Sequence, residues 1–148
     1  MFLKTEIKDI IESNLAIIAS IEQEVQHNPW SQKQFLNEYK KDGFFGFAAY
    51  QKQKVVGFII AHRIFENIEL LKIAVNIDSQ KKGIGEALIN TLKESCKSKE
   101  IERVTLEVYD KNHSAIALYK KSGFTQIAIR KNYYGAKKDA AIFILNIS

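Results

Sequence analysis

The chain has 148 residues, and its 22 basic and 17 acidic side chains give a net charge of +5. A chain of this length buries roughly two-thirds of its unfolded surface, so we expect one domain, residues 1–148, with a single fold. Its apolar runs are too short to span a membrane, and its basic residues are too scattered for a nucleic-acid-binding patch, so neither partner is expected. The charge favours an anionic ligand or cofactor.

The single cysteine and the three histidines point away from disulfide and metal chemistry. Cys96 has no partner within the chain, which is typical of a reducing compartment, and we expect a cytoplasmic protein. His27, His62 and His113 lie far apart and lack a second ligand at metal-binding spacing. We therefore predict no structural metal.

The first quarter of the chain predicts one strand and two helices. Residues 2–7 form a candidate strand, and from Lys8 apolar residues recur at helical spacing up to Val25. Pro29 interrupts this pattern. Ser31 and Gln34 then have the spacing of a capping box, which begins a second helix that runs to about residue 40.

The rest of the chain alternates between strand and helix patterns. Residues 44–51, 55–64 and 68–76 are predicted to form an antiparallel meander. A helix (84–97), a strand (104–109), a helix (113–121) and two strands (124–132 and 140–147) follow, and Gly123 ends the second of these helices. The predicted fold is α/β, with a mixed antiparallel and parallel sheet flanked by helices and a right-handed parallel crossover around Gly83.

A basic turn with two glycines precedes the helix at residue 84. Without β-carbons, Gly83 and Gly85 let main-chain N–H groups converge, and the start of the helix adds a positive partial charge. This arrangement suits a pyrophosphate. No Gly-Lys-Ser/Thr follows, and Leu88 stands where a dinucleotide fingerprint needs glycine. The alternative is that both glycines only ease a tight turn.

Three polar residues after this turn have the chemistry of an acid–base site. Glu107 shares a strand face with Thr105 and Tyr109, near the carboxyl end where ligands of open α/β sheets lie. The alternative is a solvated carboxylate. Tyr119 carries a phenol that can protonate a thiolate, and the alternative is a tyrosine that only packs in the core. Asn112 follows Asp-Lys, and its default role is that of a helix N-cap.

Two segments, residues 80–85 and 106–124, resemble the GNAT superfamily of N-acetyltransferases. Residues 27–31, 73–75 and 130–134 are further similar to the bacterial ribosomal-protein alanine N-acetyltransferases. The resemblance extends over about residues 28–144. It implies the GNAT fold, with acetyl-coenzyme A as the donor and a protein N-terminus, the N-terminal alanine of a small-subunit ribosomal protein, as the acceptor.

The resemblance also implies a role for each site residue. Glu107 matches the general base, Tyr119 the general acid and Asn112 an asparagine that contacts the cofactor. In this family the acetyl group enters a gap between parallel strands, here between Val75 and Glu107. The other cofactor-binding positions are Ile73, Ala74, Val75, Gln80, Lys81, Lys82, Gly83, Ile84, Gly85 and Glu86.

Three positions depart from the family pattern and bear on the acceptor. Asn76-Ile77 replaces Asp-Pro, Tyr109 replaces arginine, and Lys138-Asp139-Ala140 replaces Glu-Asp-Ala. We expect the acceptor groove to be lined by aromatic residues, although a packed loop tryptophan and ordinary strand tyrosines are equally consistent with the pattern. These residues are Trp30, Tyr109, Tyr133 and Tyr134.

A mechanism follows from these roles. The acceptor amine attacks the thioester directly, Glu107 takes its proton through a water, Tyr119 protonates the sulfur, and the N–H of Val75 stabilises the oxyanion. An α-amine is roughly 10–20% neutral at pH 7 and lysine below about 0.1%, which favours an N-terminus. A small-molecule amine acetyltransferase and a non-catalytic acetyl-coenzyme A-binding module remain alternatives, and the sequence carries no signal for an oligomeric state.

Overall fold

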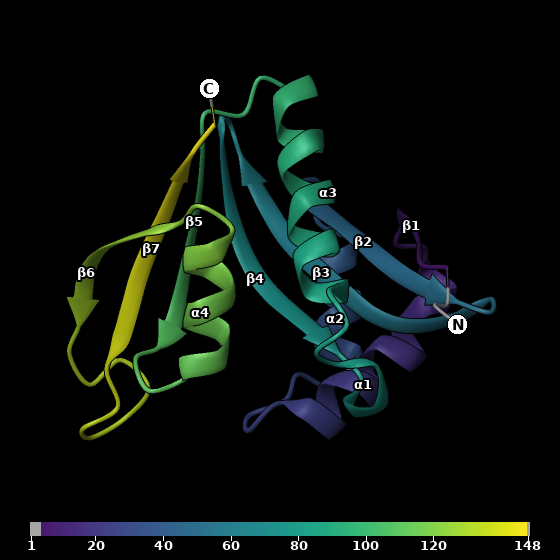
Figure 1. Ribbon diagram of the computed structural model, residues 1–148, viewed down its shortest axis with the longest axis horizontal. Coiled ribbons are helices and arrows are strands. Elements are labelled where there is room, and N and C mark those ends of the chain that lie inside the picture. The colour runs from purple at the N-terminus through teal and green to yellow at the C-terminus, as the bar shows by residue number, and fades with distance from the viewer. Residues whose placement is uncertain (1–3, 148) are drawn as a thin grey trace.

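The computed structural model describes residues 4–147 and contains one seven-stranded sheet with helices on both faces (Figure 1). The strands are β1 (Glu6–Asp9), β2 (Phe44–Gln51), β3 (Lys54–Ile64), β4 (Asn67–Val75), β5 (Arg103–Tyr109), β6 (Thr125–Arg130) and β7 (Ala140–Asn146). The helices are α1 (Leu15–Val25), α2 (Gln32–Tyr39), α3 (Ile84–Ser98) and α4 (His113–Lys121), with short 3₁₀ turns at Glu12–Asn14 and Ile77–Ser79. The predicted element order is confirmed.

The strand order in the sheet is β1-β2-β3-β4-β5-β7-β6. Strands β2 to β4 form the predicted antiparallel meander, β1 pairs antiparallel with β2, and β4 and β5 are the parallel pair that α3 connects. Strand β7 lies between β5 and β6, an insertion that the sequence pattern does not indicate. The mixed sheet confirms the predicted fold class.

Two hydrophobic clusters hold the helices to opposite faces of the sheet. Helices α3 and α4 cover one face, where Leu88 and Leu92 pack against Leu106 and Phe143. Helices α1 and α2 cover the other, with Ile18 and Phe35 against Phe58 (Figure 1). Each such side chain contributes roughly 1.5–3 kcal/mol when fully buried. The alternation of β5 is as predicted, because Val104, Leu106 and Val108 are all buried.

The N-terminal boundaries differ from the prediction. Residues 2 and 3 lie outside the described part of the chain, and the strand occupies Glu6–Asp9, so the helix does not begin at Lys8. Ile10 fits the helical spacing of apolar residues, but it is not part of the helix. Its N–H donates a hydrogen bond to the carbonyl of Gly46 on β2. Helix α1 begins only at Leu15, after a 3₁₀ turn.

Both helix-end signals are confirmed. Ser31 and Gln34 exchange the two hydrogen bonds of a capping box, at 3.2 and 2.8 Å. Gly123 follows α4 with φ +97°, a conformation that favours glycine.

Candidate active site

Strands β4 and β5 part from each other after three paired residues. Pairing begins at Asn67 with Arg103 and ends at Glu69 with Thr105. Two residues further along, β4 has a bulge in its pairing with β3. Ile60 of β3 opposes Lys72 and Ala61 opposes Leu70, so Leu71 has no opposite residue. A bulge of this kind bends its strand. The splaying that the family resemblance implies is therefore confirmed (Figure 1).

The carboxyl-terminal half of β4 offers main-chain groups to this opening. The carbonyl of Ile73 accepts a hydrogen bond from Gln26 Nε2 at 3.4 Å, and that of Val75 from Gln80 Nε2 at 2.9 Å. Main-chain groups of successive strand residues point to alternate edges, so those of Ala74 point toward β3. Of the three predicted residues, Ile73 and Val75 have main-chain groups on the open edge.

The start of α3 supplies a second set of main-chain donors. Gly83 is the N-cap residue with φ +85°, and no atom lies within 4 Å of the position that its Cβ would take. The first N–H groups of α3 have no partner within the helix. At Gly85, an added Cβ would lie 3.2 Å from Leu118 Cδ2 on α4, so the two helices approach closely there. The geometry fits a pyrophosphate.

Asn112 caps α4. Its Oδ1 accepts hydrogen bonds from the N–H of Ala115 and the hydroxyl of Ser114, both at 3.3 Å. The capping role anticipated from the sequence is therefore present. It uses only the oxygen, which leaves the side-chain amino group of Asn112 as a donor.

Glu107 lies on β5 beside the opening, on the sheet face opposite α3 and α4. Its side chain is 25% exposed, and Oε1 lies 3.2 Å from Nη1 of Arg130 on β6. The same carboxylate is the main cause that raises the pKa of Tyr133. Glu107 is thus a partly solvated carboxylate beside Arg130 and Tyr133.

Tyr119 is buried on α4. It is 6% exposed, and its ring centroid lies 5.8 Å from that of Phe124 and 6.3 Å from that of Phe143. Burial, and secondarily the nearby Tyr134, raise the pKa of Tyr119 far above its usual value. The phenol is therefore protonated at neutral pH, as a proton donor must be.

Three tyrosines of the predicted acceptor set gather near Glu107. The ring centroid of Tyr134 lies 6.4 Å from that of Tyr109 and 5.0 Å from that of Tyr133. Burial raises the pKa of Tyr134 to about 12, with a further contribution from the Glu107 charge. Tyr134 also contributes to the raised pKa of Tyr119.

Trp30 lies in the α1–α2 connection. Its ring packs on Phe35 at 5.2 Å, and Lys72 Nζ lies 5.1 Å from its centroid. The fully buried Glu22 accepts the N–H of Trp30 at 3.0 Å and pairs with Lys72 at 2.8 Å. This is the packed loop tryptophan of the alternative interpretation, and its role in acceptor binding stays a prediction.

The sequence interpretation missed Arg130, Glu22 and Lys72 as contributors to this region. Arg130 stood within a matching segment but had no assigned role, because its contact with Glu107 depends on the insertion of β7 between β5 and β6. The Glu22–Lys72 pair depends on the register of α1 over β4. Neither relation has a spacing that a sequence pattern reveals.

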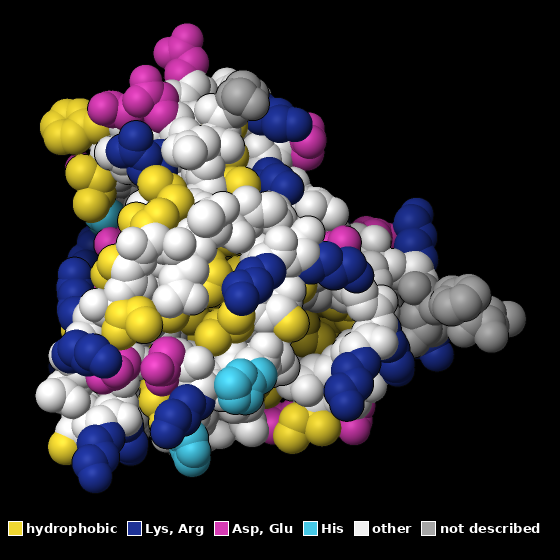
Figure 2. All heavy atoms as spheres, turned by 60° about the vertical axis from the view of Figure 1, so that its left-hand side comes forward, with side chains coloured by type: hydrophobic (Ala, Val, Ile, Leu, Met, Phe, Trp, Pro, Cys, Tyr) yellow, Lys and Arg dark blue, Asp and Glu magenta, His cyan; other side chains and the backbone are white. Residues whose placement is uncertain are grey.

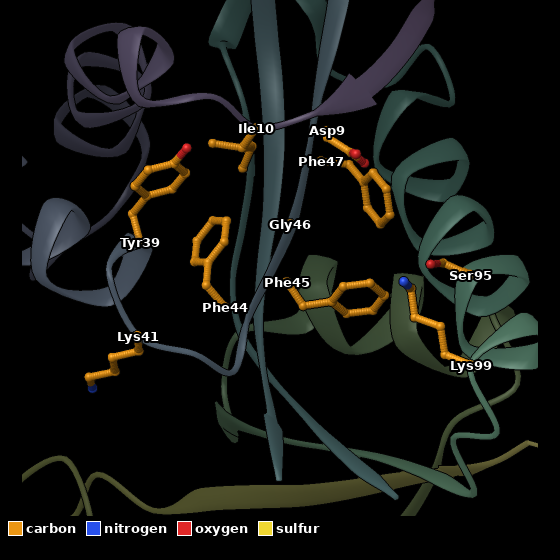
Figure 3. Close-up of a pocket in the computed structure, with 10 residues that line it drawn as sticks. All are labelled: Asp9, Ile10, Tyr39, Lys41, Phe44, Phe45, Gly46, Phe47, Ser95 and Lys99. Carbon is orange, nitrogen blue, oxygen red and sulfur yellow. The ribbon is translucent and has the colours of Figure 1, made fainter. Parts of the chain in front are cut away.

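A separate cavity of about 410 Å³ lies at the β2 edge, where β1 ends (Figure 3). Phe44 points toward Tyr39, at 5.0 Å between ring centroids, and Phe45 points to the other side of the strand, toward Lys99. None of the predicted site residues lines this cavity. It is distinct from the opening between β4 and β5.

Within residues 4–147, no group of three or more His, Cys, Asp or Glu side chains is placed to hold a metal ion. No helix of that part of the chain is long and apolar enough to cross a membrane. Lys and Arg side chains are scattered among acidic and neutral ones on the face seen in Figure 2, as expected from the sequence.

Comparison with known proteins identifies the family. Residues 13–124 match the model of the acetyltransferase (GNAT) family. The chain is 33% identical over 145 residues to ribosomal protein bS18-alanine N-acetyltransferase of Escherichia coli (strain K12), covering 96% of this chain and 97% of that protein.

Solved structures agree with this result. The crystal structure of the ribosomal-protein-S18-alanine N-acetyltransferase from Escherichia coli superposes with a TM-score of 0.92 and 32% identity, covering 98% of this chain and 95% of that one. A phosphinothricin acetyltransferase from Sinorhizobium meliloti in complex with AcCoA shares the fold, with a TM-score of 0.84 and 20% identity over 97% of this chain and 89% of that one. The chain belongs to the acetyltransferase (GNAT) family.

Proposed function

We propose that this protein transfers the acetyl group of acetyl-coenzyme A to the N-terminal α-amine of ribosomal protein bS18. The proposal rests on one structural observation, the parting of β4 and β5 with a polar main-chain edge on one side and Glu107 on the other. The relative that is 33% identical over nearly its whole length carries the name of that activity and supports the choice of acceptor.

The donor is held by main-chain groups. The pyrophosphate of acetyl-coenzyme A lies on the N–H groups from Gln80 to Glu86, and the pantetheine extends along Ile73 and Val75. In the structure these carbonyls are covered by the side chains of Gln26 and Gln80, which move aside when the donor binds. The side-chain amino group of Asn112 supplies a further donor from the start of α4.

The acid and the base come from opposite faces of the sheet. Glu107 accepts the proton of the attacking amine through a water, and the buried phenol of Tyr119 donates a proton to the departing sulfur. Because Tyr119 is protonated at neutral pH, it is in the correct state for this step. The N–H of Val75 on the open edge of β4 stabilises the carbonyl oxygen, an interaction worth about 3 kcal/mol.

The acceptor class follows from protonation. A partly solvated carboxylate that acts through water is a modest base, and it suits an α-amine with a pKa of about 7.7–8.0 better than a lysine near 10.4. The rings of Tyr109, Tyr133 and Tyr134 border the acceptor side of Glu107. The acceptor is therefore a peptide N-terminus, which in the cell is that of a ribosomal protein.

Mass spectrometry tests this proposal. Purified bS18 of the same organism is incubated with enzyme and acetyl-coenzyme A, its intact mass is measured, and the added group is located by peptide sequencing. We expect a gain of one acetyl group on the N-terminal alanine. A control peptide with a blocked N-terminus but a free lysine should gain none. Acetyl groups on lysines alone, or on polyamines but not on bS18, would contradict the assignment.

A further inference from the structure

Arg130 reaches Glu107 across an intervening strand. In the register, Glu107 of β5 opposes Ile142 of β7, whereas Tyr109 and Arg130 both oppose Ala140. Opposed residues of antiparallel strands direct their side chains to the same face. Ala140 is small and fully buried, so the Arg130 side chain can extend over it toward β5.

Two contacts define the position of this guanidinium. Its Nη1 lies 3.2 Å from Glu107 Oε1, and its central carbon lies 4.8 Å from the ring centroid of Tyr133. The Glu107 carboxylate is also close enough to Tyr133 to raise the pKa of its hydroxyl. Arg130 thus contacts both the predicted base and one of the tyrosines of the predicted acceptor set.

A contribution to stability does not explain this ion pair. The side chains of Arg130 and Glu107 are 52% and 25% exposed, and solvent-exposed pairs of this kind contribute little to the free energy of unfolding. Arg130 holds one carboxylate oxygen of the predicted base, which leaves the other oxygen for the water that carries the proton.

We propose that Arg130 is a positioning residue that orients the Glu107 carboxylate for proton transfer and couples it to the acceptor-binding tyrosines of the β6–β7 connection. This inference rests on the proposed function and deepens it. The proton of the amine passes to Glu107 as the N–C bond forms, and Tyr119 gives its proton to the sulfur as the C–S bond breaks. Arg130 exchanges no proton.

The test is a double-mutant cycle with a matched control. We expect Arg130→Gln to lower kcat by about 10- to 100-fold, as displacement of a catalytic group by ~1 Å does, and to leave the KM for acetyl-coenzyme A unchanged. In the Glu107→Gln background, Arg130→Gln should change kcat less than about twofold, because coupled residues are not additive. Arg130→Lys, which keeps a charged donor at this position, should restore part of kcat.

Lys131→Gln is the matched control, since Lys131 is 78% exposed and pairs with Asp139 at 3.4 Å instead of Glu107. It should leave kcat unchanged. A full multiplicative loss in the Glu107→Gln background, or an equal effect of Lys131→Gln, would overturn the proposal.

A measurement without turnover separates this inference from the proposed function. Crystal structures of Arg130→Gln and Lys131→Gln give the position of the Glu107 carboxylate in each variant. The carboxylate should move in Arg130→Gln and stay in place in Lys131→Gln. An unchanged carboxylate position in Arg130→Gln contradicts the role of Arg130 even if bS18 is acetylated. If bS18 is not acetylated but the carboxylate moves, only the proposed function fails.

Discussion

The two sides of the opening between β4 and β5 are built from different chemical groups. On the β4 and α3 side, the polar groups belong to the main chain of residues 73–75 and 80–86. On the β5 side, they belong to side chains, which are Glu107, Tyr109, Arg130, Tyr133 and Tyr134. Main-chain groups are present whatever the residue, whereas side-chain groups change with every substitution.

This difference explains how one fold accepts one donor and many acceptors. The side that binds acetyl-coenzyme A needs a bulged strand, an open helix start and glycine at a few positions. The acceptor side depends on residues of three separate segments, and the family departures at Tyr109 and Lys138 fall there. Substitutions on the two sides should therefore affect different kinetic constants.

The largest effect is expected for the predicted acid, Tyr119, and the predicted base, Glu107. Glu107→Gln and Tyr119→Phe should each lower kcat by about 100- to 10,000-fold, the usual contribution of a general acid or base. Binding of coenzyme A, measured by calorimetry, should be nearly unchanged. Tyr39→Phe removes a hydroxyl near the β2 cavity and is the matched control. Near-normal kcat in both site variants would refute the acid–base roles.

Alanine variants of two glycines distinguish an effect on donor binding from the cost of backbone strain. Gly83 and Gly123 have φ of +85° and +97°, and alanine at either position should cost about 1–2 kcal/mol of stability. Only the Cβ of Gly83→Ala enters the open space at the start of α3, so only this variant should raise the KM for acetyl-coenzyme A. Steady-state kinetics and urea unfolding of both variants provide the measurement. Equal changes in the KM for acetyl-coenzyme A in the two variants would contradict an anion site at the start of α3.

The acceptor side should respond in the opposite way. Tyr133→Ala or Tyr134→Ala should raise the KM for a bS18 peptide by about tenfold, because aromatic anchors at interfaces contribute more than about 1 kcal/mol. The KM for acetyl-coenzyme A should stay constant. Two hydrogen bonds hold the loop, from the N–H of Asn132 to Oδ1 of Asp139 and from the N–H of Lys137 to Oδ1 of Asn132. Neither involves a tyrosine, so the loop should keep its shape in both variants. Gln126→Ala, at an exposed position of β6 outside this loop, serves as the control.

The smallest effect concerns stability at high pH. The pKa of Tyr134 is raised from 10.0 to about 12 in the folded state, so the unfolded chain loses this proton first as the pH rises. The contribution is complete below pH 10 and is lost between pH 10 and 12. Urea unfolding should therefore show a decline over this range that is shallower in Tyr134→Phe. An identical decline in both proteins would contradict the burial of this phenol.

The donor side was more predictable from sequence than the acceptor side. The glycine turn, the strand before it and the alternation of β5 are local patterns, and all three agree with the structure. The start of α1 was misplaced because Ile10 fits a helical spacing while its main chain pairs with β2. The apolar periodicity of a segment carries no information about a hydrogen bond to a strand more than thirty residues away.

The contacts around Glu107 required three-dimensional information. Its ion pair with Arg130 follows from the position of β7 between β5 and β6 and from the small side chain of Ala140. Trp30 was grouped from sequence with the tyrosines as one acceptor set. It packs beside Lys72 and Phe35, contacts that the sequence does not indicate, and its part in acceptor binding stays a prediction.

A crystal structure with coenzyme A joined through its acetyl group to an alanine-initiated peptide is the most direct test of the central claim. We predict the pantetheine along Ile73 and Val75, the pyrophosphate at the start of α3, and the alanine nitrogen one water from Glu107. A peptide that leaves the opening away from Glu107 and the three tyrosines, or a pyrophosphate bound elsewhere, would contradict the account.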